Sequence, residues 1–138
     1  MEISRRTDYG VRIVLHLATL PQDERAVAHN IADRQKIPRP FLAKIISQLC
    51  LAGLLTTYRG AGGGVALAKP AAEITLLEVV EALEGSIRLN RCVIRPDDCP
   101  RNSYCPVHLV WSKAQADLVD RLSNTTFETL AHPVMEAV

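Results

Sequence analysis

The spacing of hydrophobic residues predicts three amphipathic helices in the first third of the chain. Apolar side chains recur every three or four positions over residues 7–20, 26–35 and 38–51, as they do along one face of a helix. We expect Thr7 to cap the first helix, which then opens with the acidic Asp8. The second and third helices are joined by a short turn and form a helix-turn-helix pattern.

A β-hairpin with a glycine-rich tip is predicted after the third helix. Residues 54–58 and 65–68 have the composition of strands, and Arg59-Gly-Ala-Gly-Gly-Gly joins them. These glycines let the backbone turn tightly and approach another surface closely. A phosphate-binding loop is the competing interpretation, but no Lys-Ser or Lys-Thr follows the glycines and no helix opens there. We therefore interpret the hairpin as the wing of a winged helix-turn-helix domain.

The outward side chains of the third helix and the tip of the hairpin are the candidate DNA contacts. The core face of that helix is expected to carry Leu42, Ile45, Ile46 and Leu49. The opposite face and the hairpin supply the candidates Arg39, Lys44, Ser47, Gln48, Arg59, Gly60, Gly62 and Gly63. Such a helix enters the major groove, and a wing arginine can enter the minor groove, whose negative potential attracts guanidinium groups. Each charged candidate could also be an ordinary solvated side chain.

The second half of the chain predicts two further amphipathic helices and a short terminal one. The pattern favours helices over residues 73–84 and 107–122, and a last helix that begins near Thr125 or Thr126. The 107–122 helix carries an apolar stripe that consists of Val107, Val110, Trp111, Ala114, Leu118 and Leu122. We interpret this stripe as a dimer interface, because it is too apolar to be left in water. The alternative is that it folds back onto its own core.

The predicted fold is mainly α-helical with one small β-hairpin. A winged helix-turn-helix domain would occupy residues 1–84, and a cluster-binding loop residues 85–106. A dimerisation helix and C-terminal segment would follow over residues 107–138.

Three cysteines and a histidine crowd into the predicted loop and the start of the next helix. Their spacing is Cys92-x6-Cys99-x5-Cys105-x2-His108. Thiolates on a loop can converge on a soft metal centre, so we expect a metal or cluster site. Zinc held by three thiolates and His108 is the alternative metal site, although gaps of six and five residues are loose for zinc. Unpaired thiols, or one disulfide with a spare cysteine, remain the interpretation without a metal.

Charge and composition support a polyanion partner and argue against an enzyme. Residues 1–69 carry a net charge of +5 and residues 70–138 a net charge of −4. The chain has no Cys-x-x-Cys pair, no general base placed by spacing and no cofactor loop, which disfavours a thiol redox enzyme. Without a long apolar run or a signal peptide, we expect a cytoplasmic location, where thiols stay reduced and act as ligands. Cys50, between two leucines, is interpreted as a small structural residue.

Taken together, the motifs resemble those of the Rrf2 family, the winged-helix iron–sulfur regulators of bacteria. The resemblance covers nearly the whole chain. It rests on Thr7-Asp8-Tyr9-Gly10-Val11-Arg12, on the Arg59 glycine run, on Leu67-Ala-Lys-Pro-Ala71, and on the three cysteines before a long helix.

The resemblance implies a homodimeric repressor that binds a palindromic DNA operator. Its iron–sulfur cluster would sense nitric oxide, iron or cluster status, with Cys92, Cys99 and Cys105 as cluster ligands. The fourth ligand is open between two matches to the family. Asp8 matches members of the family that are NsrR-like and carry a 4Fe–4S cluster, and His108 matches IscR-like members that carry a 2Fe–2S cluster. We favour Asp8 with 4Fe–4S, because a ligand from the first helix of the other subunit would connect the cluster directly to the DNA-binding head.

Overall fold

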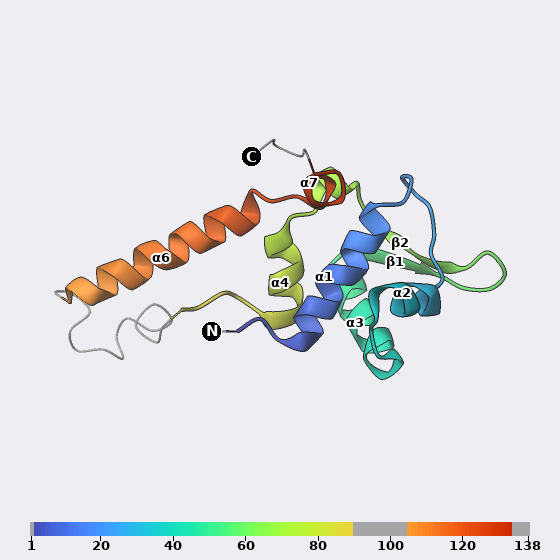
Figure 1. Cartoon of the computed structure of the whole chain (residues 1–138), viewed down its shortest axis with the longest axis horizontal. Coiled ribbons are helices and arrows are strands. Elements are labelled where there is room, and N and C mark those ends of the chain that lie inside the picture. The colour runs from blue at the N-terminus through green and yellow to red at the C-terminus, as the bar shows by residue number, and fades with distance from the viewer. Residues whose placement is uncertain (1, 90–104, 134–138) are drawn as a thin grey trace.

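Five helices and a β-hairpin make up one end of the molecule, and a single long helix extends away from them (Figure 1). The computed structural model describes residues 2–89 and 105–133. The helices of this head are α1 (Arg5–Ala18), α2 (Ala28–Gln35), α3 (Arg39–Leu51), α4 (Leu76–Glu84) and α7 (Phe127–Ala131). The strands are β1 (Leu55–Tyr58) and β2 (Gly64–Leu67), η1 (Ala71–Glu73) is one turn of 3-10 helix, and the extending helix is α6 (Pro106–Ser123).

Helix α1 lies at the centre of the head. It packs against α2, α3, α4 and α7, so its apolar side chains Ile13, Val14 and Leu17 are buried. The predicted core face of α3 is confirmed, because all four of its residues are buried. Burial of the largest core side chains stabilises each by about 1.5–3 kcal/mol relative to exposure, which holds α3 at a defined angle on α1.

The start of α1 differs from the sequence prediction. Ser4, not Thr7, is the N-cap, and its Oγ accepts a hydrogen bond of 3.2 Å from the Thr7 backbone N–H. Thr7 is fully buried inside the first turn, and its hydroxyl donates to Glu84 Oε1 over 2.8 Å. The Ser4 N–H donates to the same oxygen over 2.7 Å. Hydrogen bonds from Ser4 and Thr7 lower the pKa of Glu84, and they join the start of α1 to the end of α4.

The helix-turn-helix and the wing are confirmed, with α2 two residues shorter than predicted. Ala26 does not start α2 because it forms a β-bridge with Val65 of the wing. Lys36, at a left-handed φ of 56°, ends α2 and makes the turn into α3. The wing strands pair antiparallel from Leu55 opposite Leu67 to Tyr58 opposite Gly64.

The predicted helix over residues 73–84 is divided in two. Ile74 has an extended backbone and a fully buried side chain, and it separates η1 from α4. Thr75 then starts α4 with a capping box, in which its hydroxyl accepts from Glu78 N–H and the Glu78 carboxylate accepts from Thr75 N–H. The apolar spacing across residues 73–84 concealed this new helix start.

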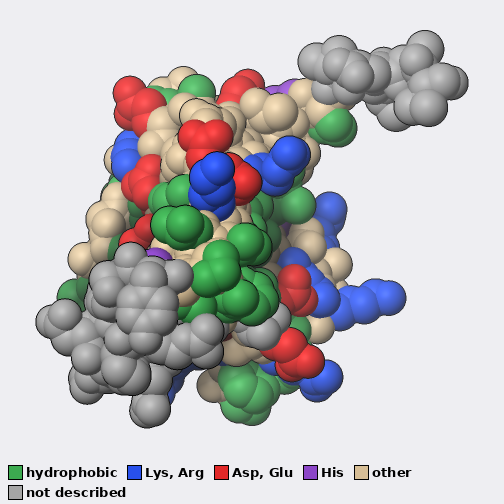
Figure 2. Space-filling view, turned by 90° about the vertical axis from the view of Figure 1, so that its left-hand side faces the viewer, with side chains coloured by type: hydrophobic (Ala, Val, Ile, Leu, Met, Phe, Trp, Pro, Cys, Tyr) green, Lys and Arg blue, Asp and Glu red, His purple; other side chains and the backbone are tan. Residues whose placement is uncertain are grey.

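Helix α6 leaves its apolar side chains largely outside the core. None of its residues is buried in the described part of the chain, and Val110 and Trp111 are 61% and 39% exposed. Figure 2 shows hydrophobic side chains exposed together on the side toward which α6 extends. The alternative that α6 folds back onto its own core is therefore not what the structure shows. The described helices include none with the length and apolar character that crossing a membrane requires.

After α6 the chain returns to the head. Phe127 of α7 is fully buried in the core, and its N–H donates to the Ile74 carbonyl over 3.0 Å. Thr126 caps α7 by accepting a hydrogen bond from the Thr129 N–H, which confirms one of the two predicted caps. Helix α7 ties the C-terminal end of α6 to the head, and α6 also contacts α4, whereas its N-terminal end is the end farthest from the head (Figure 1).

Gly10 allows α1 and α4 to approach each other, which predicts the effect of adding a methyl group. A Cβ at Gly10 would collide with Leu83 Cδ1, and Leu83 is only 4% exposed. Despite a gain in helix propensity, we expect Gly10→Ala to lower the free energy of unfolding by about 1–2 kcal/mol. Urea denaturation followed by circular dichroism measures this change. In a Leu83→Ala background the same substitution should be neutral or stabilising, and an equal loss in both backgrounds would contradict the steric explanation.

Candidate nucleic-acid interface and cluster site

The exposed face of α3 carries three of the four DNA candidates predicted on that helix. Arg39, Lys44 and Ser47 are exposed, and α3 lies with α2 and the wing at the end of the molecule opposite α6 (Figure 1). Arg39 also forms an ion pair of 3.5 Å with Asp33 of α2. Because both side chains are about two-thirds exposed, this pair contributes little to stability, and Arg39 can exchange it for a phosphate.

Gln48 differs from the other three. It is half-buried, and its Oε1 is buried without a hydrogen-bond partner among the described residues. The prediction that Gln48 points fully outward is therefore only partly met, because the side chain lies at the edge of the core. A buried acceptor without a partner costs about 1–3 kcal/mol.

Arg59 lies at the start of the turn that forms the tip of the wing. Arg59 follows β1 directly and is exposed, and Gly60 and Gly62 adopt positive φ values of 82° and 77°. Gly63 is required for a different reason. A Cβ there would lie 2.5 Å from the Tyr58 carbonyl oxygen, so the two sides of the turn can meet only at a residue without a side chain. Among the predicted glycines, Gly63 therefore has a role in shaping the tip that needs no DNA.

Arg25 is a wing residue that the sequence pattern did not indicate. Its guanidinium lies 3.5 Å from the centre of the Tyr58 ring, and Nη1 donates a hydrogen bond of 3.0 Å to the Gly62 carbonyl. Arg25 is distant from the hairpin in sequence. Its link to the wing is indicated only by its place just before Ala26, which bridges β2 in the structure.

Cys105 and His108 are the described members of the predicted cluster site. Cys105 is the N-cap of α6 and is half-buried, and His108 follows in the first turn. Residues three apart on a helix lie on the same side, so the two side chains can bind the same metal ion or cluster. Cys92 and Cys99 lie outside the described residues. Within residues 2–89 and 105–133, no group of three His, Cys, Asp or Glu side chains is close enough to hold a metal ion.

The His108 ring has one nitrogen that is buried and lacks a partner. Nδ1 makes no hydrogen bond to any described residue, whereas Nε2 lies 3.5 Å from the Ser112 hydroxyl. A buried imidazole nitrogen is normally paired or bound to a metal. This observation fits a ligand role for His108, because the ring retains a coordinating atom that pairs with no described residue.

Asp8, the other candidate ligand, is engaged elsewhere. Its Oδ2 pairs with Arg12 at 2.7 Å, and its side chain is half exposed. In Figure 1 the start of α1 belongs to the head, whereas α6, whose N-cap is Cys105, begins at its end farthest from the head. The structure does not bring Asp8 to Cys105 within one protomer, so Asp8 could reach a cluster only from a second subunit.

Cys50 is a structural residue, as the sequence indicates. It packs against the core on α3, and burial raises the pKa of its thiol. A raised pKa keeps the group protonated and disfavours metal binding.

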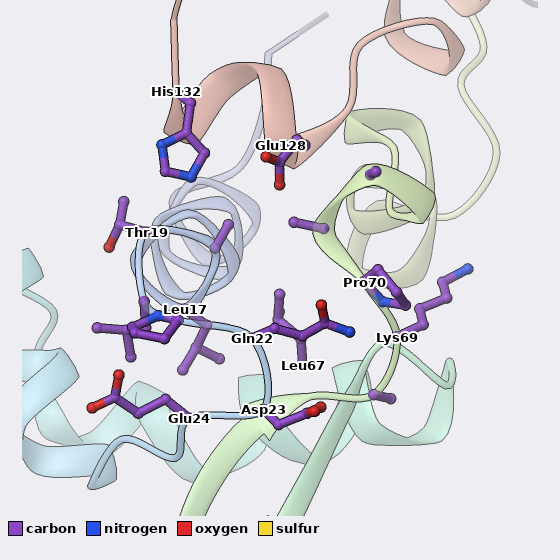
Figure 3. Close-up of a pocket in the computed structure, with 16 residues that line it drawn as sticks. Leu17, Thr19, Gln22, Asp23, Glu24, Leu67, Lys69, Pro70, Glu128 and His132 are labelled. Carbon is purple, nitrogen blue, oxygen red and sulfur yellow. The ribbon is translucent and has the colours of Figure 1, made fainter.

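A cavity of about 660 Å³ lies apart from both candidate sites (Figure 3). It is enclosed by the end of α1, the loop to α2, the end of β2 and the α7 region. Asp23, Glu24 and Glu128 contribute carboxylates to its lining. Lys69 also lines the cavity, but its ammonium group pairs at 2.8 Å with Glu78, which is not a lining residue. The sequence pattern predicted no site here, and none of the DNA or cluster candidates lines the cavity.

A family model described as an iron-dependent transcriptional regulator, Rrf2, matches residues 3–133 of this sequence. The chain belongs to the Rrf2 family. Its membership identifies it as a transcriptional regulator with a winged-helix DNA-binding fold, not an enzyme.

Three solved structures illustrate the likeness. The oxidized form of Staphylococcus aureus CymR is 28% identical at a TM-score of 0.76, and 99% of this chain and 100% of that one are covered. CymR of B. subtilis, described as the global cysteine regulator, is 27% identical at a TM-score of 0.80, with 98% and 99% covered. IscR of T. potens is 25% identical at a TM-score of 0.75, with 99% and 94% covered.

For this Rrf2-family chain, removing the Arg59 side chain tests the wing as a DNA contact. We expect Arg59→Ala to weaken binding by about 1–3 kcal/mol and to relax sequence preference where the wing lies. Fluorescence anisotropy on a duplex selected from a random library by the wild-type protein measures the loss. Arg88→Ala, an exposed arginine away from the wing, is the matched control for charge. Unchanged affinity and preference in Arg59→Ala would exclude the wing contact.

Proposed function

We propose that this chain is a homodimeric repressor whose binding to a palindromic DNA operator is controlled by an iron–sulfur cluster. The observation that carries the cluster is the buried, unpartnered Nδ1 of His108, one helical turn from Cys105. Membership in a family described as iron-dependent supports it. Cys92, Cys99, Cys105 and His108 would then hold the cluster.

His108 is preferred to Asp8 on the basis of what each side chain already contacts. Ligation through His108 uses a nitrogen that is otherwise buried without a partner, which relieves an energetic penalty of about 1–3 kcal/mol. Ligation through Asp8 requires its ion pair with Arg12 to open. This reverses the preference from sequence, where the burial of His108 Nδ1 could not be seen, and it favours a 2Fe–2S over a 4Fe–4S cluster.

The DNA-binding surface consists of α3 and the wing. In a dimer, the two α3 helices would enter successive major grooves, with Arg39, Lys44 and Ser47 at base edges or phosphates. Arg59 would reach the minor groove beside each wing. The cluster, when bound, supplies a redox-active and nitric-oxide-reactive centre whose loss frees its ligands.

The cluster site is linked to the DNA-binding surface through a series of packed helices. Of the proposed ligands, Cys105 and His108 lie at the start of α6, and α6 packs on α4. The end of α4 is held to the start of α1 by Glu84, which accepts from Ser4 and Thr7. Helix α1 packs directly on α3. A shift of α6 when the ligands are released would therefore change how the two heads are placed relative to each other.

Dimerisation follows from the exposed apolar side chains of α6. Val107, Leu109 and Val110 are each more than half exposed, and Trp111 lies beside them. Large apolar side chains gathered on one surface are a mark of an interface. A second copy of α6 is the occupant that fits, because two-fold pairing brings two identical heads to one palindrome.

A cluster-free thiol sensor, acting through cysteine oxidation or a protein partner, is the second candidate. It is favoured by the likeness to the oxidized form of S. aureus CymR and to B. subtilis CymR, described as the global cysteine regulator. Zinc held by the same cysteines is a further form of this alternative.

Spectroscopy of ligand variants separates these possibilities. We expect anaerobically purified wild-type protein to be coloured and to contain iron and sulfide. Cys92→Ser, Cys99→Ser and Cys105→Ser should lose the colour. His108→Ala should lose or shift the absorbance bands, because the cluster would then lack one protein ligand.

The controls determine the fourth ligand. Asp8→Ala and His132→Ala, the latter an exposed histidine outside the site, should leave the spectrum unchanged. Loss of a 4Fe–4S spectrum in Asp8→Ala alone would assign Asp8 from the partner subunit instead. A colourless wild-type protein that contains zinc, or no metal, would contradict the cluster and leave the thiol alternative.

A further inference from the structure

The wing is joined to the segment before α2 by backbone and side-chain contacts. Ala26 N–H donates to the Val65 carbonyl, and Val65 N–H donates to the Ala26 carbonyl, each over 2.8 Å. A Cβ at Gly64 would lie 2.7 Å from the Ala26 carbonyl oxygen, so this approach needs glycine. The two-stranded hairpin is therefore extended on its β2 side by one bridged residue, close to the turn, at the level where Val65 pairs with Thr57.

Arg25 extends that connection toward the tip of the wing. Its guanidinium covers the ring of Tyr58, the last residue of β1, at 3.5 Å from the ring centre. Its Nη1 also donates to the carbonyl of Gly62, inside the turn, over 3.0 Å. One side chain thus contacts both the end of a strand and the turn beyond it.

Such a contact is needed because the hairpin alone does not hold one orientation relative to the rest of the head. Each strand has only four residues, and an isolated two-stranded hairpin is marginally stable in water. The tip is rich in glycine and has many accessible backbone conformations. A guanidinium held over an aromatic face and bonded to a carbonyl restricts those conformations.

We propose that Arg25 is a positioning residue that holds the wing, and with it Arg59, in the orientation that meets DNA. Arg59 is the residue directly after Tyr58, so the ring that Arg25 covers fixes the backbone from which Arg59 extends. This inference rests on the proposed role of the wing in DNA binding. It differs from a phosphate contact by Arg25, since the Arg25 guanidinium is already occupied by Tyr58 and Gly62.

Hydrogen exchange without DNA tests the contact itself. We expect Arg25→Ala and Tyr58→Leu to speed amide exchange of residues 59–64 by about fivefold or more, since each removes one half of the contact. Tyr58→Phe keeps the ring and should exchange like the wild type. Exchange that is unchanged in both disrupting variants would overturn the proposal, and the melting temperature confirms that each variant is folded.

A double-mutant cycle on DNA binding tests the consequence. The duplex is the one selected by the wild-type protein. Arg25→Ala and Tyr58→Leu should each weaken binding by roughly fivefold to tenfold, and the double variant should be no weaker than either alone. If Arg25 were a phosphate contact, Tyr58→Leu would bind normally, and Arg25→Ala would reduce the slope of log affinity against log salt by about one. That pattern would overturn the positioning role.

The two experiments separate this inference from the proposed function. Faster exchange in the wing together with unchanged DNA affinity would keep the Arg25–Tyr58 contact but remove the wing from the DNA interface. Unchanged exchange together with weaker binding in Arg25→Ala would keep the DNA interface and reject the positioning role.

Discussion

The buried face of α1 is the constraint on which the rest of the structure depends. Helices α2, α3, α4 and α7 all pack on α1, and Ile13 and Val14 of α1 are fully buried. Because protein interiors are close-packed, each of these helices can occupy only one position on α1. The absence of a side chain at Gly10 lets α4 come close, and α3 is fixed with one face inward and the other toward solvent.

The same packing leaves α6 outside the core. The core is completed by α7, whose Phe127 lies beside Ile74, and α6 extends away from the head with no buried residue among those described. Its apolar side chains and the ligand-bearing first turn are consequently on one exposed helix. Dimerisation and cluster binding would therefore act on the same element, and α4 is the part of the head that would respond.

Local pattern was sufficient to predict the elements that depend on periodicity alone. The core face of α3 and the hairpin with its glycine-rich turn follow from apolar spacing and from turn chemistry. Thr7 was mistaken for the cap because its actual partner, Glu84, lies 77 residues away. The break at Ile74 was missed because an amphipathic spacing continued across it.

Side-chain partners brought together by folding were beyond the reach of sequence. The Arg25–Tyr58 contact joins two segments that only the Ala26 bridge aligns. The buried nitrogen of His108, without a partner among the described residues, likewise depends on folding and shifted the preferred fourth ligand, whereas the Asp8–Arg12 pair is a local i,i+4 contact within α1. Cys92 and Cys99 lie outside the described residues, so their role still rests on spacing.

The most direct test of the account is operator affinity measured on one preparation before and after cluster removal. The protein is purified anaerobically, its iron and sulfide are counted, and half is treated with nitric oxide or a chelator. If the cluster controls DNA binding, the affinity for the selected duplex changes on this treatment, whereas a Cys105→Ser variant, already without cluster, shows no such change. Equal affinity in the loaded and stripped wild-type protein would contradict cluster control, even if both bind DNA tightly.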